Sequence, residues 1–177
     1  MKKLLLCAVL GMATLGEAVE GLRDASAAPN RTSVVERIDN LRQETWRWQT
    51  LMGRRLTPST RSERRETSSA YRRWVLELWK DRAVRARKQA ARPPHESAWR
   101  CLQRYEAGWK ANTGNGYYGG LQMDMSFQRS YGLTLLRRKG TANNWMPVEQ
   151  MWVGERALRA GRGFYPWPNA ARKCGLI

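Results

Sequence analysis

Largely apolar residues recur at helical spacing in the first third of the chain. Intervals of four and three residues separate the members of one largely apolar stripe, namely Val34, Ile38, Leu41, Thr45, Trp48 and Met52, and this period predicts an amphipathic helix. Ser33 and Glu36 have the spacing of a capping box at its start, and Gly53 and Pro58 interrupt the pattern after it. A second helix is predicted over about 66–91, with an apolar side made of Tyr71, Trp74, Val75, Leu78 and Trp79. We expect the two helices to form a hairpin.

The first 28 residues have the three-part pattern of a secretory signal. Two lysines precede an apolar stretch over residues 4–15, and small residues follow at 25–28. The apolar stretch is too short to span a membrane. We therefore expect residues 1–28 to be a signal peptide, cut after Ala27 or Ala28, and the remaining protein to be secreted and associated with the cell wall. The alternative is an uncleaved anchor, because charged residues lie between the apolar stretch and the cut.

The chain is strongly basic, with a formal net charge of +17 and a pI near 10.8. Such a balance requires a polyanionic partner or surface. Nucleic acid is one candidate, but the predicted export favours anionic wall polymers. Two interpretations of residues 29–92, the basic helical hairpin, stay open. It is either a folded spacer with a solvated basic face or an electrostatic anchor to those polymers.

The cysteines indicate a disulfide. Apart from Cys7, inside the predicted signal, the chain has only Cys101 and Cys174. An even pair in an oxidising compartment predicts a bond between them, and two buried free thiols are the alternative. The sequence predicts no metal site and no cofactor, since one histidine and one cysteine pair do not make the usual zinc site.

A proline-containing segment, residues 93–97, is expected to act as a hinge before a second domain over residues 98–177. Ser97 is a candidate N-cap for the first helix of this domain. On that helix Trp99, Leu102 and Glu106 follow at spacings of three and four and therefore share one face. Burial there favours the neutral form of a carboxyl group. A neutral carboxylic acid is the group that protonates a glycosidic oxygen.

The residues that follow Glu106 carry a specific resemblance. The string Asn-Thr-Gly-Asn-Gly-Tyr-Tyr-Gly-Gly-Leu-Gln over residues 112–122 resembles the loop of the resuscitation-promoting factors, which have transglycosylase-like, lysozyme-related domains in actinobacterial cell walls. The resemblance covers roughly residues 99–174. It implies a mainly α (α+β lysozyme-like) small catalytic domain whose partner is the glycan strand of peptidoglycan.

By this resemblance Glu106 is the general acid/base that cleaves the β-1,4 bond between N-acetylmuramic acid and N-acetylglucosamine. The loop is then expected to bind substrate through Thr113, Asn115, Tyr117, Tyr118, Gly120 and Gln122. Trp145 precedes the helix that Pro147 is expected to start, and we expect its ring to face the sugar. The chain departs from the family where Phe127-Gln128 replaces a Thr-Trp pair, which removes one expected polar contact to substrate.

The mechanism depends on a second carboxylate. Glycosidases with two carboxylates hold them roughly 5 to 9.5 Å apart, and after Glu106 this domain offers Asp124, Glu149 and Glu155. Glu155 falls on an apolar helix face, which predicts a partly buried structural residue. Asp124 is the better candidate, although an acid at a helix start is usually a cap. Without a second carboxylate the product would carry a 1,6-anhydro ring.

Two other classes of protein fit parts of the pattern. A non-catalytic peptidoglycan-binding module would keep the loop and release no fragments. A nucleic-acid binder would account for the charge but not for the predicted signal. We expect a lytic transglycosylase or muramidase.

Overall fold

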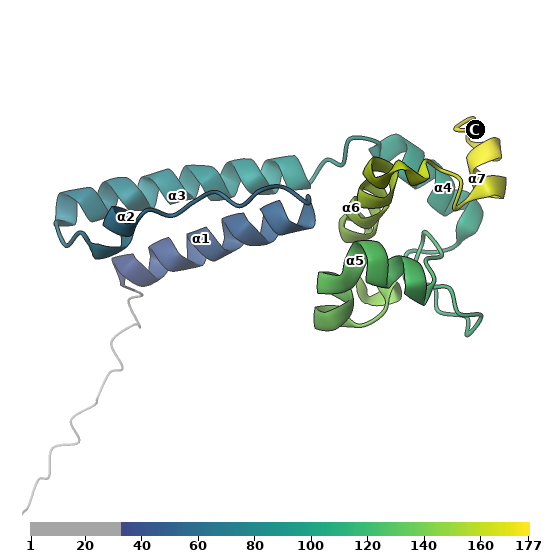
Figure 1. The fold of residues 1–177 in the computed structure, drawn as a ribbon, viewed down its shortest axis with the longest axis horizontal. Helices are drawn as coiled ribbons and strands as arrows, with labels where there is room; N and C mark the ends of the chain where they lie inside the picture. Colours follow the sequence, from purple (N-terminus) through teal and green to yellow (C-terminus); the bar gives the residue numbers. More distant parts are fainter. Residues whose placement is uncertain (1–32) are drawn as a thin grey trace, which may run out of the picture. The chain divides into compact units, whose positions relative to one another are not determined.

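The computed structural model describes residues 33–177, and the predicted signal peptide of residues 1–28 lies outside this range. The described chain is mainly helical, as predicted (Figure 1). In order, its elements are α1 (Val34–Leu51), α2 (Arg61–Arg65), α3 (Ser69–Ala90), α4 (Glu96–Glu106), α5 (Met125–Lys139), the 3-10 turn η1 (Ala142–Asn144), α6 (Pro147–Ala157), the π-helical turn η2 (Leu158–Arg162) and α7 (Pro168–Lys173). Among these helices none has the length and apolar content that crossing a membrane requires.

The first two long helices run parallel, so the predicted hairpin is wrong. The Trp46 and Trp79 rings pack with centroids 6.0 Å apart, and further along both helices Arg54 donates to Gln89 at 2.7 Å. Residue numbers thus rise together along α1 and α3, and the connection returns along the pair (Figure 1). The length of the connection explains this path. The 18 residues of α1 rise about 27 Å, and residues 52–60 in extended form span about 30 Å.

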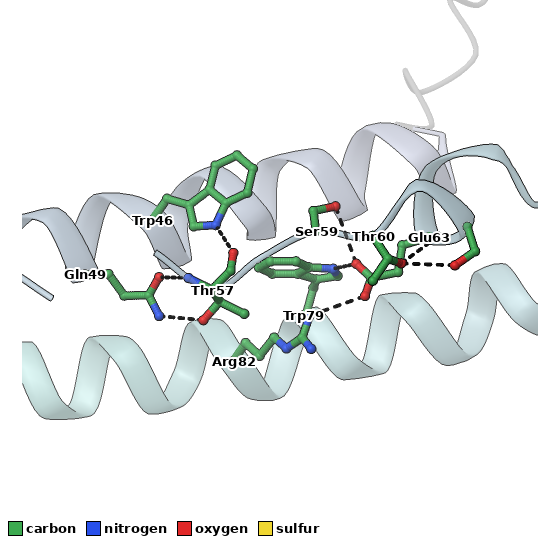
Figure 2. A network of polar contacts seen from close by, with 9 residues as sticks. Trp46, Gln49, Thr57, Ser59, Thr60, Glu63, Trp79 and Arg82 are labelled. Carbon is green, nitrogen blue, oxygen red and sulfur yellow. Dashed lines mark hydrogen bonds and ion pairs between the residues drawn. The ribbon is translucent and has the colours of Figure 1, made fainter. Parts of the chain in front are cut away.

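Polar side chains hold the returning connection against both helices (Figure 2). The indole of Trp46 donates to the Thr57 carbonyl at 2.7 Å. The side-chain amide of Gln49 donates to the Thr57 hydroxyl at 2.7 Å and accepts from the Thr57 N–H at 2.8 Å. On the α3 side the indole of Trp79 donates to the Glu63 carboxylate at 3.1 Å. These contacts give the connection a fixed course in place of a tight turn.

The apolar faces of the two helices are mostly those predicted. Ser33 caps α1 by accepting from the Glu36 N–H at 3.1 Å, and every member of the predicted stripe is buried or half-buried. On α3 the prediction is wrong for Trp74, which is 55% exposed. The buried positions of α3 are Val75, Leu76, Trp79, Ala83, Ala86 and Ala90. Small residues therefore form the later part of this face.

The C-terminal ends of α1 and α3 join the core of the second part of the chain. Leu51, Met52 and Ala90 belong to the same buried cluster as Trp99 and Leu102. The terminal carbonyls of a helix have no partner within it, and side chains from the α6–η2 region supply donors. These are Arg156 to Leu51 (2.8 Å), Arg159 to Met52 (2.8 Å) and Trp152 to Ala90 (2.7 Å).

A disulfide joins Cys101 on α4 to Cys174 at the end of α7, which confirms the predicted pairing. It fixes the chain's last helix against the helix that ends in Glu106. The second part of the chain is thus closed by a covalent bond across a sequence separation of 73 residues.

Replacing Cys101 and Cys174 by serine is expected to lower the free energy of unfolding by about 4 kcal/mol. The reason is that the unfolded chain regains the freedom that closing a loop of 73 residues removes. Urea unfolding of the oxidised protein and of the double variant measures the difference. Adding a reductant should shift the wild-type midpoint to that of the variant and leave the variant unchanged. An unshifted wild-type midpoint after complete reduction would contradict this expectation.

Candidate active site

Glu106 is the last residue of α4, on the face that the sequence predicts. Trp99 and Leu102 are fully buried on this face, and Glu106 is half-buried at its end. Burial raises the pKa of the Glu106 carboxyl above its ordinary value. The helix begins at Glu96, so the predicted cap by Ser97 is wrong, because Ser97 lies inside the first turn.

The other acids of residues 98–177, all of which the structure describes, are engaged in structural contacts. Each carboxylate accepts short hydrogen bonds: Asp124 from the Phe127 N–H (2.6 Å), Glu149 from Lys139 Nζ (2.7 Å) and the Met146 N–H (2.8 Å), and Glu155 from the His95 N–H and the Trp99 indole (both 2.8 Å). Asp124 is therefore the N-cap of α5. Glu155 is buried, as predicted. Glu106 alone in this range has a carboxylate without a hydrogen bond or ion pair to the described residues.

The loop after Glu106 folds into a compact series of turns. Tyr118 forms antiparallel bridges with Asn112 on one side and with Met123 on the other. The Gly119 N–H donates to the Ala111 carbonyl at 2.8 Å. Gly119 has a φ of 74°, a left-handed conformation that glycine adopts without steric cost. The string that carries the family resemblance is thus a folded loop.

A buried amide holds both flanks of this loop. Gln150 on α6 is fully buried. Its Oε1 accepts from the Gly120 N–H at 2.8 Å. Its Nε2 donates to the carbonyls of Trp109 at 2.8 Å and of Ala142 at 2.9 Å. One side chain therefore satisfies polar groups before and after the glycine-rich turn, as buried backbone groups require.

Two further buried side chains hold the end of the loop. Gln128 on α5 donates to the Met123 carbonyl at 2.8 Å and accepts from the Ala142 N–H at 2.9 Å. The Trp167 indole donates to the Leu121 carbonyl at 2.5 Å. Gln128, at which the sequence departs from the family pattern, is thus fully buried and supports the loop from within. Sequence reasoning missed all three of these supporting roles, and the one available signal for Gln150 was an amide directly before the apolar run Met151-Trp152-Val153.

The loop lies against the turn of α4 that ends in Glu106. A Cβ atom on Gly120 would stand 2.8 Å from the Gln103 side chain and 2.7 Å from the Trp109 ring, so only glycine fits there. Gln103 in turn donates to the Ala107 carbonyl at 2.7 Å. These contacts place the backbone of Gly120 beside the residues that flank the acid.

The predicted substrate-binding residues differ in exposure. Thr113, Asn115 and Tyr117 are exposed, Tyr118 and Gln122 are half-buried, and Gly120 is buried. Asn115 shapes the loop by accepting from the Tyr117 N–H at 3.0 Å. Gln122 donates to the Gly119 carbonyl at 2.9 Å. The Tyr117 side chain is 47% exposed.

The expectation for Trp145 is corrected. Its side chain is 2% exposed, and its indole donates to the Gly140 carbonyl at 2.8 Å. The ring packs so closely over Gly132 that a Cβ atom there would lie 2.6 Å from it. Trp145 is therefore a core residue, and its position in a loop does not expose it.

Comparisons with known proteins match the part of the chain that contains Glu106 and the loop after it. Residues 94–170 match the family model described as a transglycosylase-like domain. The chain is 38% identical over 77 residues to resuscitation-promoting factor RpfE of Mycobacterium tuberculosis, covering 42% of this chain and 41% of that protein. It is 37% identical over 86 residues to resuscitation-promoting factor Rpf1 of Corynebacterium glutamicum, covering 46% of this chain and 42% of that protein.

These alignments leave more than half of each relative's length unmatched. No solved structure gives a significant match. The matched range begins at the segment that precedes α4 and ends within α7, so it contains Glu106 and the whole loop after it. Residues 94–170 are therefore similar to transglycosylase-like domains, as the loop sequence indicated.

Proposed function

We propose that this protein is a secreted, wall-associated lytic transglycosylase that cleaves the β-1,4 bond between N-acetylmuramic acid and N-acetylglucosamine in peptidoglycan. The observation that carries the proposal is the contrast among the acids of residues 98–177. Glu106 has a raised pKa and a carboxylate without a hydrogen-bond partner among residues 33–177, and the other three acids are engaged in structural hydrogen bonds.

A single acid is sufficient for this reaction. The neutral Glu106 carboxyl gives its proton to the glycosidic oxygen as the bond from that oxygen to C1 of the muramic residue breaks. The Glu106 carboxylate then takes the proton of the muramic C6 hydroxyl, whose oxygen bonds to C1. The products are a 1,6-anhydromuramic end and a free 4-hydroxyl group on N-acetylglucosamine. No water is consumed, and Glu106 returns to its neutral form.

The loop contributes position and shape. Because three buried side chains hold the loop, the backbone of Gly120 keeps a fixed place beside the end of α4. The exposed ring of Tyr117 offers a stacking face for a sugar, and the exposed side chains of Thr113 and Asn115 offer hydrogen-bonding groups for its hydroxyls.

The identity of the products tests this proposal. Purified peptidoglycan is digested with the protein, and the soluble muropeptides are analysed by mass spectrometry. Anhydromuramic ends, lighter than hydrolytic ends by one water, would support it. Hydrated reducing ends would establish a muramidase instead, and the absence of soluble fragments would favour the non-catalytic binding module.

Asp124→Asn is expected to leave both the products and their rate within about twofold of wild type. Asparagine caps helices as well as aspartate does, so the variant removes the carboxylate and keeps the start of α5. Muropeptide release over time, measured beside the wild type, checks this. A loss of more than about a hundredfold in a folded variant would identify Asp124 as the second carboxylate and contradict the single-acid mechanism.

A further inference from the structure

A basic hollow of about 430 Å³ lies where the C-terminal ends of α1 and α3 meet the second part of the chain. Its lining residues are Arg54, Arg85, Lys88, Gln89, Arg92, Pro94 and Trp152. Four of these are cationic and exposed, and none is acidic. We call this cavity the basic hollow, and its four cations are Arg54, Arg85, Lys88 and Arg92.

None of the four cations forms an ion pair with a described residue, although arginines nearby do. Arg87, on the same helix, pairs with Glu44 at 3.2 Å. Arg54 is instead held by a neutral acceptor, Gln89 Oε1, at 2.7 Å. The four cations therefore line one hollow that has no carboxylate among its lining residues.

Helix dipoles do not account for this accumulation of charge. The C-terminal end of a helix carries about half of one negative charge, so the parallel ends of α1 and α3 together supply about one. Arg156 and Arg159 already donate to the terminal carbonyls of α1. Burial and the charge of Arg159 lower the pKa of Arg156 to about 10, which leaves it charged at neutral pH. The four cations of the basic hollow are thus in excess of what the helix ends require.

We propose that the basic hollow binds a polymer whose backbone carries phosphodiester groups. Guanidinium groups match phosphate oxygens in a two-pronged geometry, and a surface of one charge sign concentrates the opposite sign nearby. The hollow fits single-stranded nucleic acid less well, because such strands need aromatic faces for their bases. Trp152 in its floor is 3% exposed, and its indole N–H is already bonded to Ala90.

This inference goes beyond glycan cleavage and does not depend on it. A transglycosylase held on a phosphate polymer of the wall would encounter glycan strands at a raised local concentration. The parallel arrangement of α1 and α3 is what makes such a site, since it brings Arg54 beside the last two turns of α3.

The test compares two triple variants with equal loss of charge. The first removes cations of the basic hollow, Arg85→Ser, Lys88→Ser and Arg92→Ser. The second removes exposed arginines of α2 that form no ion pair with described residues, Arg61→Ser, Arg64→Ser and Arg65→Ser. Binding of the full chain to immobilised poly(glycerol phosphate) teichoic acid is measured at several salt concentrations, with thermal unfolding as the check that both variants fold.

The first variant is expected to bind about tenfold more weakly or worse, and the second no more than about threefold more weakly. The dependence of log K on log salt should become shallower by about two for the first variant alone, because binding with fewer phosphate contacts releases fewer counterions. Equal losses in the two variants would overturn the proposal in favour of diffuse attraction. So would binding of poly-L-glutamate of matched charge through the same three residues. Muropeptide release, measured in parallel, separates failure of this site from failure of the proposed cleavage.

Discussion

The Glu106→Gln variant is expected to release soluble muropeptides about 10²–10⁴-fold more slowly than the wild type, because it removes the proposed general acid. Glutamine keeps the size of the side chain and loses the exchangeable proton. The loss should appear in kcat, since the exposed loop that would contact the sugar is unchanged. Muropeptide release from purified peptidoglycan, followed by mass spectrometry, measures it.

The same residue sets an expected pH dependence. The neutral form of Glu106 starts the reaction, so activity should fall as pH rises through the raised pKa of its carboxyl.

The raised pKa of Glu106 also determines how the stability of the protein changes with pH. A carboxyl with a raised folded-state pKa contributes stability that is present at low pH and lost as pH rises through that pKa. Glu106→Gln should therefore unfold at the same or a higher temperature than wild type near neutral pH, and any gain should disappear in acid.

A second glutamate on α4 serves as the matched control. Glu96 lies at the opposite end of the helix and pairs with Arg100 at 2.8 Å in an exposed position, where ion pairs contribute little. Glu96→Gln makes the same chemical change and should keep its activity within about twofold. If Glu106→Gln retained activity close to that of Glu96→Gln, Glu106 would not be the catalytic acid.

Features that depend on short stretches of sequence could be predicted. The start of α1 follows from Ser33, and its buried stripe follows from the helical period. The position of Glu106 on an apolar face follows from its spacing to Trp99 and Leu102. The disulfide follows from the number of cysteines in a chain that is expected to be exported. Each of these rests on a local pattern or on a choice among very few partners.

The direction of α3 relative to α1 could not be predicted in this way. Helical periodicity is the same for parallel and antiparallel neighbours, and the turn residues after α1 suggested a short reversal. The outcome depends instead on the side chains that bind the connection along its course, such as Gln49 to Thr57. These bonds join residues whose polar character is also typical of solvent-exposed loops.

The supporting side chains of the site were missed for a related reason. Gln128 and Gln150 are polar residues that became fully buried because backbone groups of the loop needed partners. Trp145 is the reverse case. Its place in the loop before Pro147 suggested contact with substrate, but its side chain is buried in the core. Burial of such residues depends on the closed tertiary structure, which a one-dimensional pattern does not contain.

Gln150→Leu is expected to lower the free energy of unfolding by roughly 2 to 6 kcal/mol. Leucine leaves the Gly120 N–H and the Trp109 carbonyl without their partner, and each unsatisfied buried group costs about 1–3 kcal/mol. The Ala142 carbonyl still accepts from the Trp145 N–H. Where the variant is still folded, the loop beside Glu106 should be less fixed. We therefore expect kcat to fall about tenfold or more and KM to change less. Urea unfolding and digestion kinetics measure the two effects.

Gln43→Leu provides the matched control for this prediction. Gln43 is exposed on α1, so the same substitution there should change stability by no more than about 0.5 kcal/mol. Amide hydrogen exchange separates positioning of the loop from general weakening of the fold. In Gln150→Leu the Gly120 amide should exchange faster by a larger factor than amides in the middle of α3. Equal acceleration at both places, with kcat unchanged in the folded variant, would mean that Gln150 stabilises the core and does not position the loop.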